Sequence, residues 1–446
     1  MASDTFGGQT IARTANAAPA GGAARVIDAV REGKARNVIL FVGDGTGEAE
    51  LTAARNYLRG GDGRFASLDS FLLSGSCTNY SVLRGAPDKH NYVTDSAAAA
   101  TAWSTGVKTY NGAIGVDAHG EPRQTIVEWA REQGLRTGIV TTEEVCDPTP
   151  AAMAAHVADR TCRGPDSMEA CPVQDRANGG SGSIAEQLVR TRPDVLLGGG
   201  AGYFAQTVRD GHQPPRTVLD LARAAGYEVV TTADELSAAA GDGPVIGLFS
   251  EGPLARRLVG PIASPEGTAP TLCALNPDRP STQPSLRHMT ERALELLSRG
   301  REGDDQPGFF LMVESALIDN ASHDADPCGM IGEVGELDDA VSAGLRYARE
   351  HPDTLVLVTA DHCHTSQIVP VDVKSPGATV TLTAHDGEPM MINYGTNLVG
   401  LIQVHTGSQV RIAAEGPGAY QVLGLMDQTG LFSLIQRTLK VSTEHV

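Results

Sequence analysis

Short apolar runs rich in branched residues alternate along this chain with longer stretches in which apolar residues recur every three or four positions. The first pattern is typical of strands buried on both faces of a sheet, and the second of helices packed on one face. The stretch Glu333–Glu350 gives the clearest helical pattern. The runs that we expect to be buried strands are Val38–Val42, Gly138–Thr142, Val195–Leu197, Val245–Phe249, Phe309–Val313 and Leu355–Val358.

Strands that alternate with helices predict an α/β fold with a mostly parallel central sheet flanked by helices. A length of 446 residues fits two to three domains or one large α/β domain. We find no repeat and no break in composition, and therefore expect one domain over residues 31–446, with loop insertions such as the Pro-, Thr- and Ser-rich stretch 260–285. Residues 1–30, rich in Ala and Gly, are expected to form a flexible arm.

Composition narrows the possible functions. Hydrophobic residues make up 41% of the chain and charged residues 20%, enough apolar material for a sizeable core. No run approaches the roughly 18 consecutive apolar residues of a membrane span. The formal net charge of −19 argues against nucleic-acid backbones and anionic membranes as partners. A phosphate substrate remains possible, because a bound metal can reverse the field inside one pocket.

The amino terminus and the cysteines bear on the compartment. Met1–Ala24 has neither the basic segment nor the apolar run of a secretory signal, so the protein is either cytoplasmic or exported with its signal removed. Of the seven cysteines, Cys162 and Cys171 bracket a short polar loop. Their spacing leaves open a disulfide or two buried thiols. The absence of a CxxC pair argues against a zinc ribbon.

Polar residues suited to metal binding follow three of the expected strands. Asp44 follows the first strand, Glu314 follows Phe309–Val313, and Asp361-His362 follows Leu355–Val358. Ligands collect at the carboxyl ends of strands in open α/β sheets. Carboxylate and imidazole are zinc ligands. We therefore predict a shared metal site at this edge of the sheet.

Two further segments fit such a site. Asp319 and His323 stand four residues apart, which places them side by side on one helical turn. The segment Gly43–Gly47 is glycine-rich but is not G-x-G-x-x-G, and Asp44 would repel a pyrophosphate. Asp44 is better explained as a metal ligand. His364, two residues beyond His362, could share its side of the chain or lie in a polar loop.

Ser96 opens a run of small residues that reads as a helix. A serine at a helix start has an accessible Oγ beside helical N–H groups, which suits a nucleophile that attacks an anionic group. The local sequence alone favours ordinary N-capping by Asp95 or Ser96. The chain has no G-x-S-x-G elbow, which argues against an α/β-hydrolase.

Taken together, these segments resemble the bacterial alkaline phosphatases from Val38 to the end of the chain. The matching stretches stand in the family's order and are highly specific as a set. They are NVILFVGDGTGEAELTAARNY, YVTDSAAAATAWSTGVKTYNGAIGVD, DPTPAAMAAHVADRTCRG, VESALIDNASHDADPCG, VTADHCHTSQIV and HTGSQVRIAAEGPGA.

The resemblance implies two zinc ions and one magnesium ion per chain. Ser96 matches the nucleophile that forms a phosphoserine, and Arg160 matches the arginine that clamps the phosphate. The ligands of one zinc correspond to Asp319, His323 and His405. Those of the second zinc correspond to Asp44, Asp361 and His362. The magnesium ligands correspond to Asp44, Thr149 and Glu314.

Residues behind the ligands are implied as well. Asp95 matches the carboxylate that orients the arginine, His364 lies behind Asp319, and Asp147 supports the magnesium site. Asn320 stands where many members carry a lysine, so we expect weaker phosphate binding. Cys146 and Cys363, which flank site residues, are expected to be sensitive to oxidation.

The resemblance also implies cellular features. Two disulfides, Cys162–Cys171 and Cys273–Cys328, match the family and indicate a periplasmic or secreted protein whose signal has been removed. The family is typically homodimeric, and its substrates are phosphate monoesters of broad variety. This gives a phosphomonoesterase as the leading function.

Three other functions are alternatives to a phosphomonoesterase. A related metal-dependent phosphodiesterase would need a pocket for a second ester group. A sulfatase would need a modifiable cysteine in C-x-P-x-R, which the sequence lacks. A non-catalytic zinc-stabilised binding protein is disfavoured by the intact Ser96 and the complete set of ligands.

Overall fold

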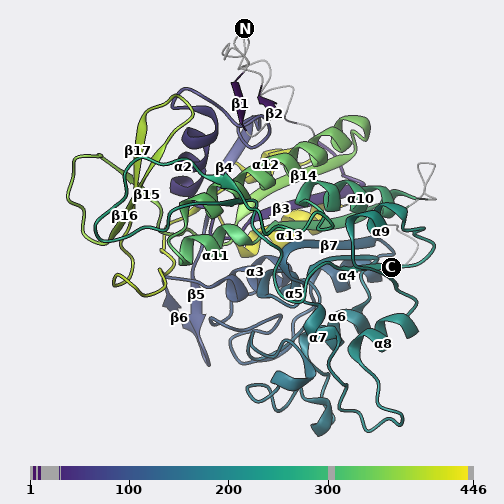
Figure 1. Ribbon diagram of the computed structural model, residues 1–446. Helices are drawn as coiled ribbons and strands as arrows, with labels where there is room; N and C mark the ends of the chain where they lie inside the picture. Colours follow the sequence, from purple (N-terminus) through teal and green to yellow (C-terminus); the bar gives the residue numbers. More distant parts are fainter. Residues whose placement is uncertain (1–3, 7–8, 12–29, 31, 300–306, 440–446) are drawn as a thin grey trace.

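The computed structural model describes residues 4–6, 9–11, 30, 32–299 and 307–439. Its centre is a ten-stranded sheet with helices on both faces (Figure 1). The arm expected over residues 1–30 lies largely outside the described residues. The parts of it that are described are Val30 and the strands β1 (Asp4–Phe6) and β2 (Gln9–Ile11). The expectation of a single domain stays a prediction.

The predicted mostly parallel sheet is confirmed. From β14 to β9 every neighbouring pair is parallel, whereas β18 is antiparallel to both β14 and β4. In spatial order the strands are β19 (Gly424–Asp427), β4 (Leu73–Thr78), β18 (Val410–Glu415), β14 (Thr354–Ala360), β3 (Asn37–Gly43), β13 (Phe309–Ser315), β7 (Arg136–Glu144), β8 (Val195–Gly199), β10 (Val245–Leu248) and β9 (Glu228–Val230). All six strands expected from the apolar runs are among them.

Short sheets surround the central one. Strands β15 (Gln367–Val369), β17 (Pro389–Tyr394) and β16 (Ala378–Thr383) form a three-stranded sheet, and two hairpins pair β5 (Ser81–Leu83) with β6 (Ala86–Asn91) and β11 (Leu258–Val259) with β12 (Ala274–Leu275). In the second hairpin, β11 precedes the stretch 260–285, which was expected to be a loop insertion, and β12 lies within it. The α-helices are α2 (Glu48–Arg59), α3 (Ser96–Thr105), α4 (Ile126–Glu132), α5 (Pro148–Ala152), α6 (Ile184–Thr191), α7 (Ala201–Phe204), α8 (Val218–Ala224), α9 (Ala233–Ala238), α10 (Leu286–Ser298), α11 (Leu317–His323), α12 (Pro327–Glu350) and α13 (Thr429–Thr438).

The sheet divides the apolar core into two layers. Along β3, alternate side chains point to opposite faces, so Leu40 packs into one layer and Phe41 into the other. Helices α3, α4, α6 and α13 cover the first layer, and α2, α10 and α12 cover the second (Figure 1). Burial on both faces explains why the strands are continuously apolar rather than alternating.

Helix α12 begins earlier than the helical pattern predicted. It starts at Pro327 rather than near Glu333, because the Asp326 side chain accepts the backbone N–H of Gly329 at 2.9 Å and Pro327 is preorganised for a first helical position. The segment Asp326–Gly329 looks like a turn in the sequence because the same residue types form caps and turns.

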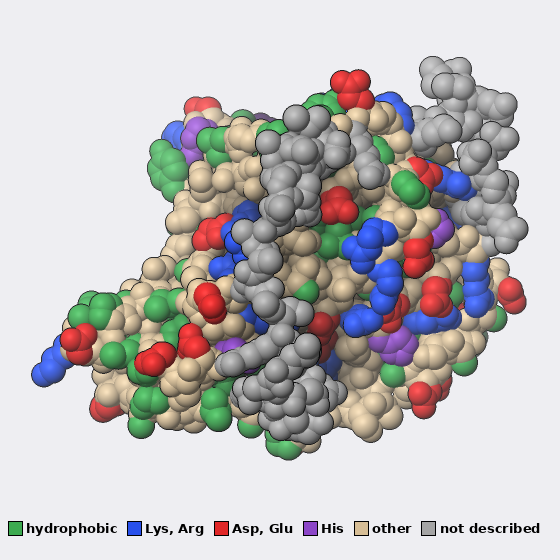
Figure 2. Space-filling model, turned by 90° about the horizontal axis from the view of Figure 1, so that it is seen from above, with side chains coloured by type: hydrophobic (Ala, Val, Ile, Leu, Met, Phe, Trp, Pro, Cys, Tyr) green, Lys and Arg blue, Asp and Glu red, His purple; other side chains and the backbone are tan. Residues whose placement is uncertain are grey.

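The surface carries charges of both signs. Figure 2 shows acidic and basic side chains interspersed over one face. Within the described part of the chain, none of the helices is both long and apolar enough to cross a bilayer.

Candidate active site

The carboxyl ends of three adjacent parallel strands meet at one edge of the sheet. Glu314 of β13 is in register with Val42 of β3, and Gly43 of β3 is in register with Ala360 of β14. Asp44, Asp361 and His362 therefore come together, with one ligand atom of each within 4.8 Å of the others. The predicted convergence of these strand ends is confirmed.

A second group of possible ligands lies beside the first. Helix α11 carries Asp319 and His323 on one turn, with His323 Nε2 at 3.2 Å from Asp319 Oδ2. His405 Nε2 and His364 Nε2 lie 3.4 Å and 3.3 Å from Asp319 Oδ1. His364 thus belongs to the group itself as well as lying behind Asp319.

The orientation of two histidines suits a metal ion bound by both. His323 Nδ1 faces the carbonyl oxygen of Gln403, and His405 Nδ1 faces that of Thr94 at 3.2 Å. A carbonyl oxygen only accepts, so in neutral rings the hydrogen is on Nδ1 and the lone pair on Nε2. The two Nε2 atoms are only 3.1 Å apart. Two facing lone pairs repel unless a metal ion binds both or a proton is shared between the rings and Asp319, and second partners orient metal-binding histidines in this way.

The carboxylates of the cluster point to the same conclusion. Burial, and then the neighbouring carboxylate of Asp361, raise the pKa of Asp44 well above its usual range. Burial raises the pKa of Glu314 to about 8 and that of Asp361 to about 6. For Asp319 burial acts in the same direction, but hydrogen bonds from the surrounding histidines lower its pKa well below the usual range. Buried carboxylates so close together are stable as anions only beside positive charge.

Several buried polar atoms of the cluster have no hydrogen-bond partner among the described residues. They are Asp44 Oδ1, Asp361 Oδ2 and Thr149 Oγ1. Leaving such atoms unpaired costs about 1–3 kcal/mol each. The imidazole and carboxylate donors fit zinc, and the oxygens of Glu314, Asp44 and Thr149 fit magnesium. The donor set therefore fits the metals that the resemblance implies.

Ser96 lies at the junction of these groups. It is the first residue of α3, and its Oγ is 3.2 Å from His362 Nε2. The cap of the helix is Asp95, whose Oδ1 accepts the N–H of Ala98 at 2.9 Å. The Ser96 hydroxyl is consequently not needed to cap the helix and faces the ligand cluster instead.

Arg160 lies beside Asp95. Its Nη1 lies 3.4 Å from Asp95 Oδ2, and its Nη2 lies 4.0 Å from Asp147 Oδ1. Asp95 Oδ2 also accepts the N–H of Gly112 at 2.8 Å, so this carboxylate is held in place by the backbone. The structure thus brings Arg160 to Asp95, the carboxylate that the resemblance associated with it, and also places it near Asp147.

A third acidic group was missed from the sequence. Glu143, Glu144 and Asp147 lie together at the end of β7, all buried, and Arg163 donates to both Glu144 and Asp147. The Asn320 side chain donates to Glu143 Oε2 at 3.1 Å. The signal was present as Glu143-Glu144 directly after an apolar strand, three residues before Asp147.

Both expected disulfides are present. Cys162 is bonded to Cys171 and Cys273 to Cys328, and Cys77, Cys146 and Cys363 are free and buried. Burial raises the pKa of the Cys363 thiol to about 12 and also that of Cys146. Because the thiolate is the reactive form, the structure gives no support to the expected sensitivity to oxidation.

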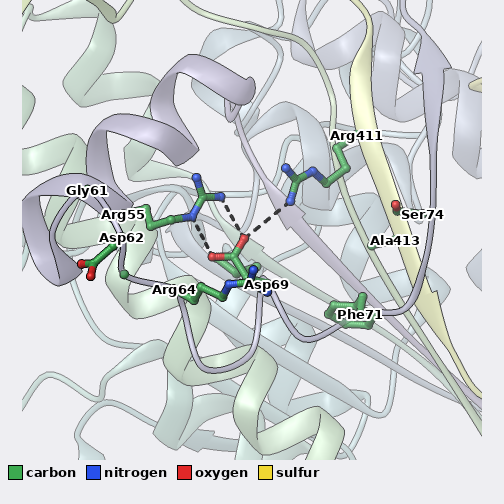
Figure 3. Close-up of a pocket in the computed structure, with 11 residues that line it drawn as sticks. Arg55, Gly61, Asp62, Arg64, Asp69, Phe71, Ser74, Arg411 and Ala413 are labelled. Atoms are coloured by element: carbon green, nitrogen blue, oxygen red, sulfur yellow. Dashed lines mark hydrogen bonds and ion pairs between the residues drawn. The ribbon is translucent and has the colours of Figure 1, made fainter. Parts of the chain in front are cut away.

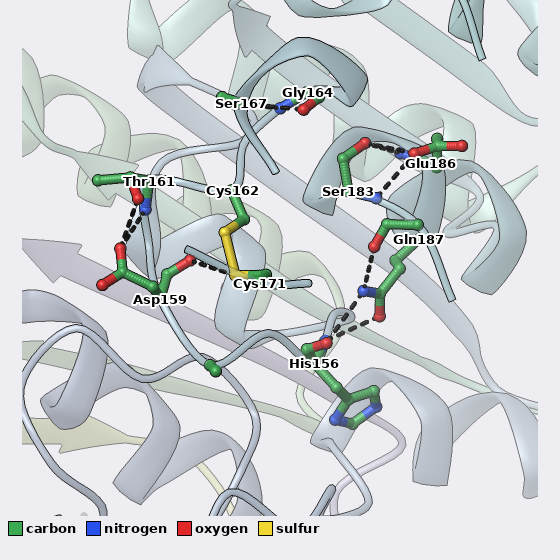
Figure 4. Close-up of a disulfide and its surroundings, with 12 residues drawn as sticks. His156, Asp159, Thr161, Cys162, Gly164, Ser167, Cys171, Ser183, Glu186 and Gln187 are labelled. Atoms are coloured by element: carbon green, nitrogen blue, oxygen red, sulfur yellow. Dashed lines mark hydrogen bonds between the residues drawn. A yellow bond between two sulfur atoms is a disulfide. The ribbon is translucent and has the colours of Figure 1, made fainter. Parts of the chain in front are cut away.

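The Cys162–Cys171 bond fixes the backbone directly after Arg160. Figure 4 shows this disulfide beside His156 and Gln187. The Gln187 side chain accepts the N–H of His156 at 2.9 Å and donates to its carbonyl oxygen at 3.0 Å. The segment that carries Arg160 is therefore tied to α6 on one side and closed by a disulfide on the other.

A separate cavity of about 430 Å³ lies away from this cluster, beside α2 and β4. Its lining includes three arginines, Arg55, Arg64 and Arg411, with Asp69 between Arg55 and Arg411 (Figure 3). Arg55 binds Asp69 through two hydrogen bonds of 2.7 and 2.8 Å. Arg411 binds Glu48 through two of 2.7 Å. The charges of Arg55, Asp69 and Arg411 are thus paired, unlike several of those at the cluster.

Comparison with known proteins places the chain in a family. Residues 35–404 match the family model described as alkaline phosphatase. The chain is 49% identical over 417 residues to alkaline phosphatase H of Pseudomonas aeruginosa (strain UCBPP-PA14), which covers 92% of this chain and 86% of that protein. It is 51% identical over 410 residues to streptomycin-6-phosphate phosphatase of Streptomyces griseus, covering 91% and 90%.

The fold is also found among solved structures. An alkaline phosphatase from Thermus thermophilus superposes with a TM-score of 0.68 at 23% identity, over 95% of this chain and 96% of that one. The chain thus carries two groups of metal-type ligands around a serine at the ends of its strands. Its close relatives are named as phosphatases. The chain belongs to the alkaline phosphatase family and is a hydrolase of phosphate esters.

Proposed function

We propose that the protein hydrolyses phosphate monoesters of broad variety through a phosphoserine on Ser96, at a site that binds two zinc ions and one magnesium ion. The observation that carries this proposal is the position of Ser96 Oγ, which lies 3.2 Å from His362 Nε2 and does not cap helix α3. The unpaired ligand atoms around it support the metals.

The ligand sets follow the two groups and the buried oxygens. One zinc would be held by Asp319, His323 and His405. The other zinc would be held by Asp44, Asp361 and His362. Magnesium would be held by Asp44, Thr149 and Glu314, with Thr141 Oγ1 donating to Glu314 Oε2 at 2.6 Å. When bound, these cations would polarise the phosphoryl oxygens, lower the pKa of the attacking hydroxyl and stabilise the departing oxygen.

The residues of the chain divide the remaining work. The two outer nitrogens of Arg160 can donate to two phosphate oxygens at once, which lysine could not do. Ser96 Oγ then bonds to phosphorus while the ester bond breaks, and the alcohol leaves with a proton. Water attacks the phosphoserine, phosphate is released, and Ser96 regains its hydroxyl hydrogen. Asp95 keeps Arg160 oriented between these steps.

A homodimer outside the cytoplasm is part of the same proposal. Two disulfides support an oxidising compartment, periplasmic or extracellular. The loop before His405 exposes Leu398, Leu401 and Ile402 by 74%, 57% and 65%, an apolar surface that a second copy would cover. Sedimentation of the purified protein tests the dimer directly.

The proposed chemistry is tested by turnover of a chromogenic aryl phosphate monoester and of its methyl diester, each with and without a chelator. We expect chelator-sensitive hydrolysis of the monoester and little of the diester. Preference for the diester would favour the related phosphodiesterase, and no turnover of either by metal-loaded protein would reject both. Streptomycin 6-phosphate, which appears in the name of the relative from Streptomyces griseus, should be included as a test substrate.

A further inference from the structure

A short stretch of backbone carries two arginines that reach the same carboxylate. Arg163 donates through Nη2 to Asp147 Oδ1 and through Nη1 to Glu144 Oε2. Arg160 Nη2 lies 4.0 Å from that same Asp147 oxygen, too far for a hydrogen bond. Arg163 therefore occupies the position on Asp147 that Arg160 would otherwise take.

The acidic group at the end of β7 needs this positive charge. Burial, and then the charges of Asp147 and Glu144, raise the pKa of Glu143 well above its usual range, whereas Arg163 lowers it. Asn320 donates a hydrogen bond to Glu143 but brings no charge. Within the described residues, Arg163 and Arg160 are the cations that act on Asp147. The guanidinium of Arg163 fills the space between Glu144 and Asp147, so the group is closed by an arginine rather than open to a metal.

The backbone holds Arg163 rigidly enough for this role. Its carbonyl oxygen accepts the N–H of Ala185 in α6 at 2.9 Å. The preceding residue, Cys162, is fully buried and is bonded to Cys171. The Arg163 side chain is 22% exposed, so its ion pairs are largely shielded from water. A side chain fixed at both its backbone and its guanidinium can hold a carboxylate in one place.

We propose that Arg163 is a positioning residue that keeps Asp147 engaged and so leaves Arg160 available to bind phosphate. Without it, Asp147 turns to the nearest remaining cation, Arg160, and draws that guanidinium away from the phosphate. The inference rests on the proposed function, since it assigns Arg160 to the phosphate. It requires no contact between Arg163 and the substrate.

The test compares the wild type with Arg163→Met, Arg163→Lys and the double variant Arg163→Met/Asn320→Lys. For each we would measure kcat and KM on an aryl phosphate and Ki for inorganic phosphate. We expect Arg163→Met to raise KM and Ki about fivefold or more, corresponding to roughly 1 kcal/mol, with a smaller change in kcat. Arg163→Lys should recover part of the affinity. The double variant should recover part as well, because Asn320 already reaches the acidic group.

Arg55→Met is the matched control, because Arg55 also forms a shielded ion pair, with an 18% exposed side chain, but lies at the remote cavity. Equal rises in Ki for Arg55→Met and Arg163→Met would show a general loss of stability and overturn the proposal. So would an unchanged Ki in Arg163→Met. If Arg163→Met fails to fold, Arg163→Lys and the double variant Arg163→Lys/Asn320→Lys are measured instead. A Ki equal to that of the wild type in both of these variants overturns the proposal.

Failure of the proposed function gives a different result. In that case the wild type itself does not turn over the monoester. Phosphate affinity measured by calorimetry on the metal-loaded protein then decides the role of Arg163, because Arg163→Met must still weaken phosphate binding. Equal affinity of wild type and variant in that measurement overturns the inference.

Discussion

The cluster at the strand ends and the cavity beside α2 are both built from charged side chains, yet they differ in how those charges are satisfied. At the cavity Asp69 is bound by two nitrogens of Arg55 and accepts the N–H of Phe65 at 2.9 Å. These bonds outweigh burial and lower the pKa of Asp69. At the strand ends burial raises the pKa of Asp44, and Asp44 Oδ1 has no hydrogen-bond partner in the described ranges.

This difference separates a structural ion pair from a site prepared for a ligand. Satisfied charges rigidify the fold, whereas buried unsatisfied charges cost stability and persist where a bound group repays that cost. The comparison predicts opposite responses to substitution. Variants at the strand ends should lose activity without losing the fold, and variants at the cavity should lose a little stability and no activity.

The largest effect is expected from Ser96→Ala. Removal of the proposed nucleophile should lower kcat by about 10⁴-fold or more, while metal content and the unfolding temperature stay near wild type. Steady-state kinetics and metal analysis check this. A phosphoenzyme trapped at acid pH on the alanine variant would remove Ser96 from the proposed mechanism.

Asp44→Asn sharpens the comparison most directly. In metal-free protein the neutral amide relieves repulsion with Asp361, so the unfolding temperature should rise by a few degrees, about 1 kcal/mol. Metal content and activity should fall. Asp69→Asn at the cavity is the matched control, and it should destabilise. If both variants destabilise the metal-free protein equally, the distinction between the two regions is wrong.

Among the variants expected to affect stability alone, loss of a disulfide should have the largest effect. Loss of Cys273–Cys328, with Ser in both positions, should reduce the free energy of unfolding by about 2–4 kcal/mol. Thiol labelling of the unfolded, unreduced wild type should find the three free cysteines Cys77, Cys146 and Cys363. Seven labelled thiols would contradict both bonds and favour a cytoplasmic protein.

His156, on the segment that carries Arg160, forms a satisfied pair whose strength depends on pH. Its Nδ1 faces Gly115 O at 2.7 Å and its Nε2 faces Glu128 Oε1 at 2.9 Å, so both ring nitrogens can donate when the imidazole is protonated. Burial alone would lower the pKa of His156, but Glu128 raises it above the ordinary value. The stabilisation is therefore complete below about pH 6.5. It is lost as pH rises through the folded-state pKa.

We accordingly expect His156→Gln to cost about 1–2 kcal/mol near pH 6 and less at alkaline pH. Chemical denaturation of both proteins between pH 5.5 and 9 measures the difference. The lower limit of that range stays above the pKa of Glu128. Burial raises this pKa, but the contact with His156 outweighs burial and lowers it below the usual value. A cost that grows with pH would mean that His156 is neutral in the folded protein.

The smallest effect is expected at the cavity. Arg55→Met should reduce stability by at most about 1 kcal/mol, since partly exposed ion pairs contribute little, and should leave kcat and KM unchanged. Denaturation and kinetics measure both. A change in KM there would show that the two regions are coupled.

The strands and the chemistry at their ends could be predicted from the order of the residues alone. Continuous apolar runs predict doubly buried parallel strands, and Asp44, Glu314 and Asp361 follow such runs directly, because parallel strands bring their carboxyl ends to one edge. The Asp319–His323 pair follows in the same way from the spacing of a helical turn. These features are local, so the order of residues is sufficient to reveal them.

Other features depended on the tertiary structure. The choice between Asp95 and Ser96 as the helix cap, the partners Gln403 and Thr94 that orient two histidines, and the arginine that closes the acidic group were not resolved by the sequence. Arg163 and Asp147 are sixteen residues apart, and Arg55 and Asp69 fourteen. Both pairs read alike in the sequence. Only burial and the surrounding partners decided that one pair lies beside Arg160 and the other at a distant cavity, because the free energy of a charge depends on its environment.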